Sequence, residues 1–306
     1  MPRQIIPAGS DPTAIGEVSA PPFARLPDPA LLFSRRAERW NALAAGHDLG
    51  PYLRFLAALA DAQHRIQQEG LAEPEMPDAA ARERARSFGM PPLDRGNLAP
   101  DAAAETLDRL VVAASEIKKT VAAADALDRL KQAAPAKRGD MVRNVLADAI
   151  PMEALAEHVY VAAALQVHFA RLAARLDARA LVPVGDGACP ACGSPPTSSI
   201  IVGWQGAHGA RFCACSLCGT LWNYVRIKCT LCGSTKGIGY QEIDGGPGTV
   251  KAETCDSCGC YVKILHQHKD PGLDPVADDV ATLGLDILVR EGGYRRGSFN
   301  PFLIGY

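Results

Sequence analysis

Four short cysteine pairs constrain this chain more than any other feature. Each pair has the form Cys-x-x-Cys-Gly, and the pairs begin at Cys189, Cys215, Cys229 and Cys255. A gap of 22 residues separates the first pair from the second, and the same gap separates the third from the fourth. A shift of 40 residues superimposes the first two pairs and their glycines on the last two. Such a fixed period indicates two copies of one structural unit.

The pairs have the spacing of metal ligands. A Cys-x-x-Cys-Gly turn brings two sulfurs to one point, and glycine fits where the chain needs a positive φ. Two such turns on neighbouring hairpins complete a tetrahedron of thiolates. A unit of about 40 residues has too little core to fold unaided, so metal supplies the missing stability. We therefore predict two metal ions, each held by four cysteines: Cys189, Cys192, Cys215 and Cys218 in one site, and Cys229, Cys232, Cys255 and Cys258 in the other.

Three alternatives stay open at this point. The second pair can instead combine with the third, because only ten residues separate Cys218 from Cys229. Disulfides would replace metal in an oxidising compartment. A closed site of four thiolates suits either zinc or a single iron ion. Zinc would make the sites structural, whereas iron would add one-electron chemistry, and the spacing does not choose between them.

Other candidate ligands are weaker. Cys213 and Cys260 fall outside the 40-residue repeat, so we predict half-buried apolar thiols, with a redox role as the alternative. His266 and His268 lie on one face of a predicted strand. We do not expect them to bind metal, because four thiolates already close each site.

The chain divides by composition into an α+β, multidomain arrangement. Residues 1–27 are rich in Pro, Gly and Ala and are predicted to form an extended, poorly ordered arm. Apolar residues then recur at helical spacing, which predicts an all-α domain over 28–182. Its helices are expected at 28–45, 51–70, 100–118, 120–133, 138–149 and 152–179, with one short helix within 73–92. The last and longest should be amphipathic, with His158 and His168 at the core edge or surface.

Alternating segments follow, which predict two tandem rubredoxin-like or zinc-ribbon modules. The modules are expected over 183–226 and 227–270, with a C-terminal helix and tail over 271–306. The strands are expected at 199–204, 210–213, 221–228, 249–254 and 261–265, and the helix at about 274–291.

Charge and motif content exclude several functions. The formal net charge is −2 and the pI is about 6.4. Domains that bind nucleic acid are usually strongly basic, so we do not expect a nucleic-acid partner. No run approaches the roughly 18 apolar residues of a membrane span, and the first residues do not resemble a secretory signal. We expect a cytoplasmic protein without membrane insertion. The absence of a phosphate loop or nucleophile elbow predicts that it is not an enzyme.

The order of these segments resembles a known family. A helical domain precedes the four cysteine motifs, then a helix containing Val276-Ala-Asp-Asp, then a tail reading Ser298-Phe-Asn-Pro-Phe-Leu. This combination is similar to the formate dehydrogenase accessory proteins of the FdhE family. The resemblance implies a cytoplasmic maturation factor for respiratory formate dehydrogenase, a molybdenum-type iron–sulfur enzyme exported by the twin-arginine route. It implies contact with the catalytic subunit before export, and iron, rather than zinc, bound by the eight paired cysteines.

Two other functions remain alternatives. One is a rubredoxin-like electron-transfer protein, and the other is a zinc ribbon that binds nucleic acid, with Arg226 and Lys228 beside Trp222 and Tyr224. Five aromatic residues are candidates either for a client interface or for small cores between strands: Trp204, Trp222, Tyr224, Phe299 and Phe302.

Overall fold

The first half of the chain is helical, as its apolar period predicts. The computed structural model describes residues 21–99 and 101–303. Its first seven α-helices are α1 Pro29–Leu43, α2 Gly50–Gln68, α3 Ala79–Ser87, α4 Ala104–Ser115, α5 Val121–Gln132, α6 Pro135–Leu146 and α7 Leu155–Ala173. Short 3-10 turns lie at Arg95–Asn97, Met152–Ala154 and Ala178–Ala180. Asp28, Asp78 and Thr120 cap α1, α3 and α5 by accepting a backbone N–H two or three residues on.

Helix α7 is the centre of this helical body. It packs against α2, α4, α5 and α6, and almost every residue from Glu157 to Ala173 is buried. The prediction of an amphipathic helix was therefore wrong for α7, and so was the placing of His158 and His168 at its edge, because both are buried. Alanines around the helix let neighbours approach from every side, so no polar face is left.

The second half forms one mixed sheet. The described strands are β1 Ala24–Arg25, β2 Pro196–Ile201, β3 Arg211–Cys215, β4 Leu221–Asn223, β5 Ile238–Gln241, β6 Val250–Cys255, β7 Cys260–His266 and β8 Arg295–Arg296. Their order is β1-β4-β3-β2-β7-β6-β5, with β8 beside β7. The 40-residue shift maps β2, β3 and β4 onto β5, β6 and β7, so each repeat unit is a three-stranded antiparallel meander.

The two units are joined within this sheet. Strands β2 and β7 pair in parallel, with Ser199 opposite Ile264. Arg211 of the first unit reaches Glu253 of the second at 2.7 Å, and both side chains are buried. The same guanidinium donates to Ser199 Oγ at 3.1 Å. The units therefore share a core as well as backbone hydrogen bonds.

Two predicted segments beside the sheet also differ from the structure. The strand expected at 221–228 ends at Asn223, after which the chain turns toward the third cysteine pair. Ile227 has a φ of 56°, and Val225 and Ile227 are 64% and 60% exposed, so their alternation does not reflect a strand. The arm expected at 1–27 lies mostly outside the described residues, but Ala24 and Arg25 pair with β4 and are not a loose arm.

The C-terminal helix is broken into two. Helix α8 spans Ala277–Ala281 and α9 spans Leu283–Glu291, with Thr282 between them. The Thr282 hydroxyl donates to Asp278 O at 2.7 Å, and Lys263 Nζ donates to the carbonyls of Asp279 and Thr282. The hydroxyl and the ammonium group thus bind carbonyls that would otherwise accept hydrogen bonds within the helix, which explains the interruption at Thr282. The tail then returns to the helical body, where Phe302 meets Trp40 edge to face at 5.7 Å.

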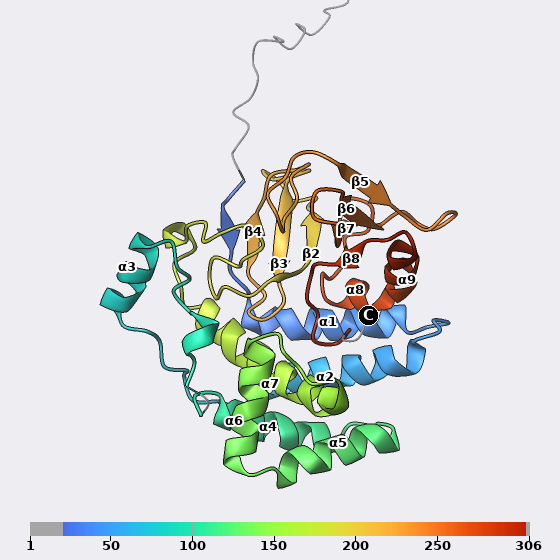
Figure 1. Ribbon diagram of the computed structural model, residues 1–306. Coiled ribbons are helices and arrows are strands. Elements are labelled where there is room, and N and C mark those ends of the chain that lie inside the picture. The colour runs from blue at the N-terminus through green and yellow to red at the C-terminus, as the bar shows by residue number, and fades with distance from the viewer. Residues whose placement is uncertain (1–20, 100, 304–306) are drawn as a thin grey trace, which may run out of the picture.

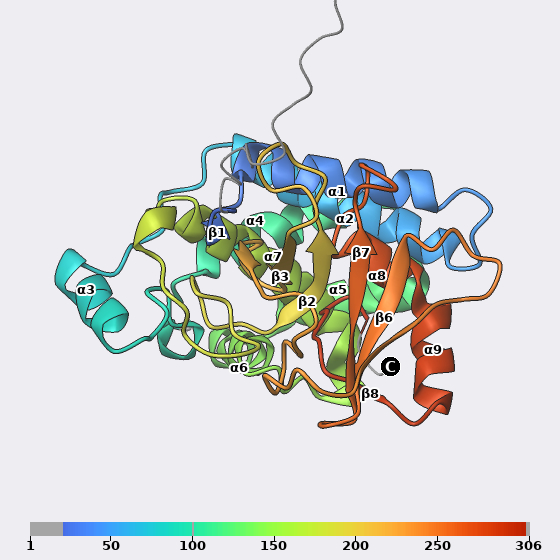
Figure 2. The same ribbon diagram turned by 90° about the horizontal axis from the view of Figure 1, so that it is seen from above.

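The arrangement has a helical layer and a sheet layer. Figure 1 shows α1 between the strands and most other helices, and in Figure 2 α1 lies toward the top of the view, near the ends of β2 and β7. Helix α8 packs against α1, so the C-terminal segment contacts both layers. Within the described part of the chain, no helix combines the length and apolar character needed to cross a membrane.

Candidate metal centres

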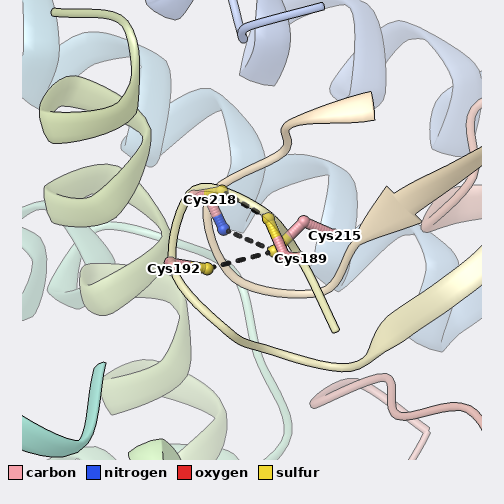
Figure 3. A group of neighbouring side chains, drawn as sticks. All are labelled: Cys189, Cys192, Cys215 and Cys218. Atoms are coloured by element: carbon pink, nitrogen blue, oxygen red, sulfur yellow. Dashed lines mark hydrogen bonds between the residues drawn. The ribbon is translucent and has the colours of Figure 1, made fainter. Parts of the chain in front are cut away.

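The first cysteine quartet lies where the sheet meets the helices. Cys189 and Cys192 come from the loop before β2, while Cys215 ends β3 and Cys218 lies in the turn before β4. Figure 3 shows the four side chains converging. Cys189 Sγ is 3.7 Å from Cys218 Sγ, and Cys192 Sγ is 3.4 Å from Cys215 Sγ. All four sulfurs lie within 4.8 Å of one another.

The second quartet repeats this geometry. Cys229 Sγ is 3.8 Å from Cys258 Sγ, and Cys232 Sγ is 3.8 Å from Cys255 Sγ. The structure therefore brings together the pairs that the equal 22-residue gaps favoured, and does not bring the second pair to the third. All ten cysteines are free thiols.

These distances fit a metal ion. A tetrahedral ion bonded to four sulfurs at about 2.3 Å would separate the sulfurs by about 3.8 Å. The four separations given above, which are 3.4–3.8 Å, are close to this value. Four thiolates gathered at one point also repel one another and need a cation between them to be stable. Each quartet can therefore hold one metal ion, and the donor set suits iron and zinc alike.

The motif glycines have the conformation that the sequence predicted. Their φ values are positive at all four positions, between 64° and 77°: Gly193, Gly219, Gly233 and Gly259. In the first, third and fourth turns the glycine N–H donates to the carbonyl of the first cysteine, at 2.8, 3.1 and 2.8 Å. Any residue with a Cβ would be strained there.

Nearby donors offset the charge on the sulfurs. The backbone N–H groups of Leu217 and Cys218 donate to Cys215 Sγ at 3.4 and 3.3 Å. Ser194 Oγ lies 3.4 Å from Cys192 Sγ, and Thr220 Oγ1 lies 3.1 Å from Cys218 Sγ. Such contacts orient the ligands and tune the bound metal. We did not predict these hydroxyls, although each stands directly after a motif glycine.

The two quartets differ in exposure. Every cysteine of the first is buried, with an exposed fraction of 2% or less, and all four belong to the large apolar core that includes the helices. In the second, Cys232 is exposed and Cys258 is half-buried. Strand β5 is the sheet edge there, so solvent reaches the second site.

The remaining cysteines are not part of either quartet. Cys213 is fully buried, not half-buried as predicted, and burial raises the pKa of its thiol to about 12. Cys260 is half-buried, and its Sγ lies 3.4 Å from Cys258 O. Among the described residues, the two quartets are the only groups of three or more potential ligands this close together, and neither contains His266 or His268.

The candidate aromatic residues are mostly inside the protein. Trp222 and Phe302 are buried, which removes them from an exposed interface and removes Trp222 from a base-stacking surface. Trp204, Tyr224 and Phe299 are half-buried. The Tyr224 hydroxyl donates to Asp186 Oδ1 at 2.5 Å and lies 3.0 Å from Cys229 O, so it packs beside the second site.

Comparison with known sequences matches three family descriptions along the chain. These are "FdhE, N-terminal" over residues 21–186, "FdhE, central domain" over 188–226 and "FdhE, C-terminal domain" over 227–303. A protein from Rhizobium meliloti (strain 1021), named "Protein FdhE homolog", is 49% identical over 99% of both chains. "Protein FdhE" of Escherichia coli O9:H4 (strain HS) is 36% identical over 89% of this chain and 88% of its own.

A solved structure has the same fold. It is the crystal structure of the FdhE protein from Pseudomonas aeruginosa, with a TM-score of 0.82 and 34% sequence identity. The match covers 93% of this chain and 99% of that chain. The likeness thus extends across both the helical body and the sheet.

Proposed function

The chain belongs to the FdhE family, and from this premise we propose that it binds the catalytic subunit of formate dehydrogenase in the cytoplasm before export. Family membership supports the broader role of a formate dehydrogenase accessory protein. One observation carries the proposal: the three family segments match in order from residue 21 to 303, with all eight paired cysteines gathered in two quartets.

The chemistry of the quartets supports a role without catalysis. Four thiolates complete a tetrahedral coordination sphere and leave no position where a substrate could bind the metal. We propose iron in each site, with zinc as the alternative. The proposed ligands are Cys189, Cys192, Cys215 and Cys218 in the first site and Cys229, Cys232, Cys255 and Cys258 in the second. A bound ion would supply stability and, if it is iron, one-electron chemistry. The chain's own part is to hold the sulfurs, to offset their charge and, at the first quartet, to exclude water.

Metal content tests the ligand assignment. We expect two metal ions per chain in protein isolated anaerobically, measured by elemental analysis with a visible spectrum. Cys192→Ser should retain one ion. Cys260→Ser is the matched control and should retain both, because Ser194, Thr220 and Ser234 occupy the same place after the other motif glycines. Two ions in Cys192→Ser would contradict the assignment.

Client binding tests the role itself. We expect the full chain to co-purify with the catalytic subunit from cells that make both, and formate dehydrogenase activity to be lost in cells lacking this protein. Full activity in those cells would refute the proposal.

A rubredoxin-like electron carrier is the second candidate, because the exposed Cys232 gives a redox partner access to the second site. It requires iron whose visible absorbance changes reversibly on reduction. Protein that folds in cells with zinc alone would exclude it.

A further inference from the structure

An apolar groove crosses the helical body away from both quartets. It has a volume of about 770 Å³ and is lined by α2, the start of α5 and the start of α7. These three helices lie in the lower half of Figure 1. Its walls include Tyr52, Phe55, Val159 and Tyr160. A second hollow of about 340 Å³ shares Tyr52, Ala156 and Val159 with it, so the apolar surface continues toward the C-terminal tail.

The aromatic wall of the groove is fixed in place. Tyr52 and Phe55 stack with ring centroids 6.3 Å apart, and Phe55 meets Tyr160 edge to face at 6.0 Å. The Tyr52 hydroxyl donates to Phe302 O at 2.8 Å, and the Tyr160 hydroxyl donates to Ala123 O at 2.9 Å. Because both hydroxyls are already bonded to the protein and Tyr160 is itself buried, the wall offers a ligand mainly the carbon of Tyr52 and Phe55. Rigid aromatic surfaces of this kind bind partners at a low entropic cost.

The charge around the groove has one sign. Arg54, Lys118 and Lys119 line it, and no described carboxylate does. Lys118 is exposed, and no described side-chain hydrogen bond or ion pair involves it. A partner that fits this surface has apolar anchors for the wall and Asp or Glu residues for the rim.

We propose that this groove is the docking surface for the client, and that it binds an apolar segment of the catalytic subunit flanked by acidic residues. The inference rests on the proposed function and adds the surface and the chemistry of the contact. A segment flanked by basic residues would be repelled by the rim. Docking here leaves the exposed side of the second quartet free.

A charge placed in the groove tests the proposal. Ala156 is exposed and is the second residue of α7, where a glutamate is compatible with the helix N-terminus. Ala136 is exposed and is the second residue of α6, outside the groove, so Ala136→Glu is the matched control. Binding of each full-length protein to purified catalytic subunit would be measured by interferometry. We expect Ala156→Glu to weaken binding roughly tenfold or more and Ala136→Glu to change it less than about twofold.

Charge reversal at the rim provides a second test. Lys118→Glu should slow association several-fold and reduce its dependence on salt, whereas Lys137→Glu on the exposed face of α6 should not.

The outcomes separate this inference from the proposed function. If the unmodified chain does not bind the catalytic subunit, both fail. If it binds, and Ala156→Glu and Ala136→Glu bind with the same affinity, the assignment of the groove is overturned and the proposed function stands. A dimer that dissociates only in Ala156→Glu would assign the groove to a second copy of this chain. A lower melting temperature in Ala156→Glu with unchanged client binding would assign it to another segment of the same chain. Either result would overturn the proposal.

Discussion

Four buried charges join the sheet to the C-terminal segment, and they allow a quantitative prediction. Lys263 of β7 contacts Asp286 of α9 at 2.5 Å and Asp279 of α8 at 3.5 Å. Arg296 of β8 contacts Asp279 at 2.5 Å and Asp286 at 2.7 Å. Side-chain exposure is 0% for Lys263 and both aspartates and 7% for Arg296. Two positive and two negative charges therefore balance away from water.

We predict that Lys263→Met destabilises the protein by about 3–5 kcal/mol, because it leaves a buried carboxylate without a counter-ion. The substitution also removes the donor to the Asp279 and Thr282 carbonyls at the helix break. The loss would be a large part of the roughly 5–15 kcal/mol that stabilises a typical domain. Adding Asp286→Leu restores the charge balance and should recover about 2 kcal/mol or more.

Urea unfolding of metal-loaded protein, followed by far-UV circular dichroism and tryptophan fluorescence, would measure these changes. Lys251→Met is the matched control on the neighbouring strand. Its partner Glu242 is 3.0 Å away, but the two side chains are 25% and 47% exposed, so we expect a loss below about 1 kcal/mol. If Lys263→Met costs no more than this control, or if the double variant is no more stable than the single one, the reasoning is refuted.

Three further predictions follow from burial. Burial, assisted by Arg171, lowers the pKa of His168 to about 4. The unfolded chain therefore binds a proton at this histidine below about pH 6.5, whereas the folded chain does so only near pH 4. This difference should account for roughly 2 kcal/mol of the stability that the protein loses between pH 7 and pH 5, and His168→Gln should abolish that part of the loss in urea unfolding. A chelator added with a thiol reagent should release one metal ion per chain well before the other, from the quartet with the exposed Cys232, and a single release rate would contradict this. Cys192→Ser should lower the melting temperature of the helices, whereas Cys232→Ser should leave it within a few degrees, as followed by circular dichroism at 222 nm.

The candidate metal sites could be predicted from the sequence because their chemistry is local. Equal 22-residue gaps favour one pairing of the cysteine motifs, and the need for a positive φ explains each glycine. The helices of the first half could be placed for a similar reason, since apolar period and capping residues such as Asp28 act within a few residues.

The rest depends on neighbours that are distant in the sequence. Residues 221–228 alternate like a strand, yet among the described residues no strand pairs with them beyond Asn223. The burial of His158 and His168 follows from helices packed around all of α7, which no local pattern records. The difference in exposure between the quartets has the same origin, because it depends on which unit faces the helices.

The two repeat units fit together because they are not identical. Arg211 and Cys213 of β3 correspond, after the shift of 40 residues, to Lys251 and Glu253 of β6. Arg211 is buried and pairs across the units with Glu253, whereas Lys251 is half-exposed and pairs within its own unit. If position 213 were also a glutamate, it would place a second buried carboxylate beside a single guanidinium, which is costly without another cation. The apolar Cys213 avoids that cost, so the cysteine that does not belong to the metal repeat is explained by the interface between the repeats.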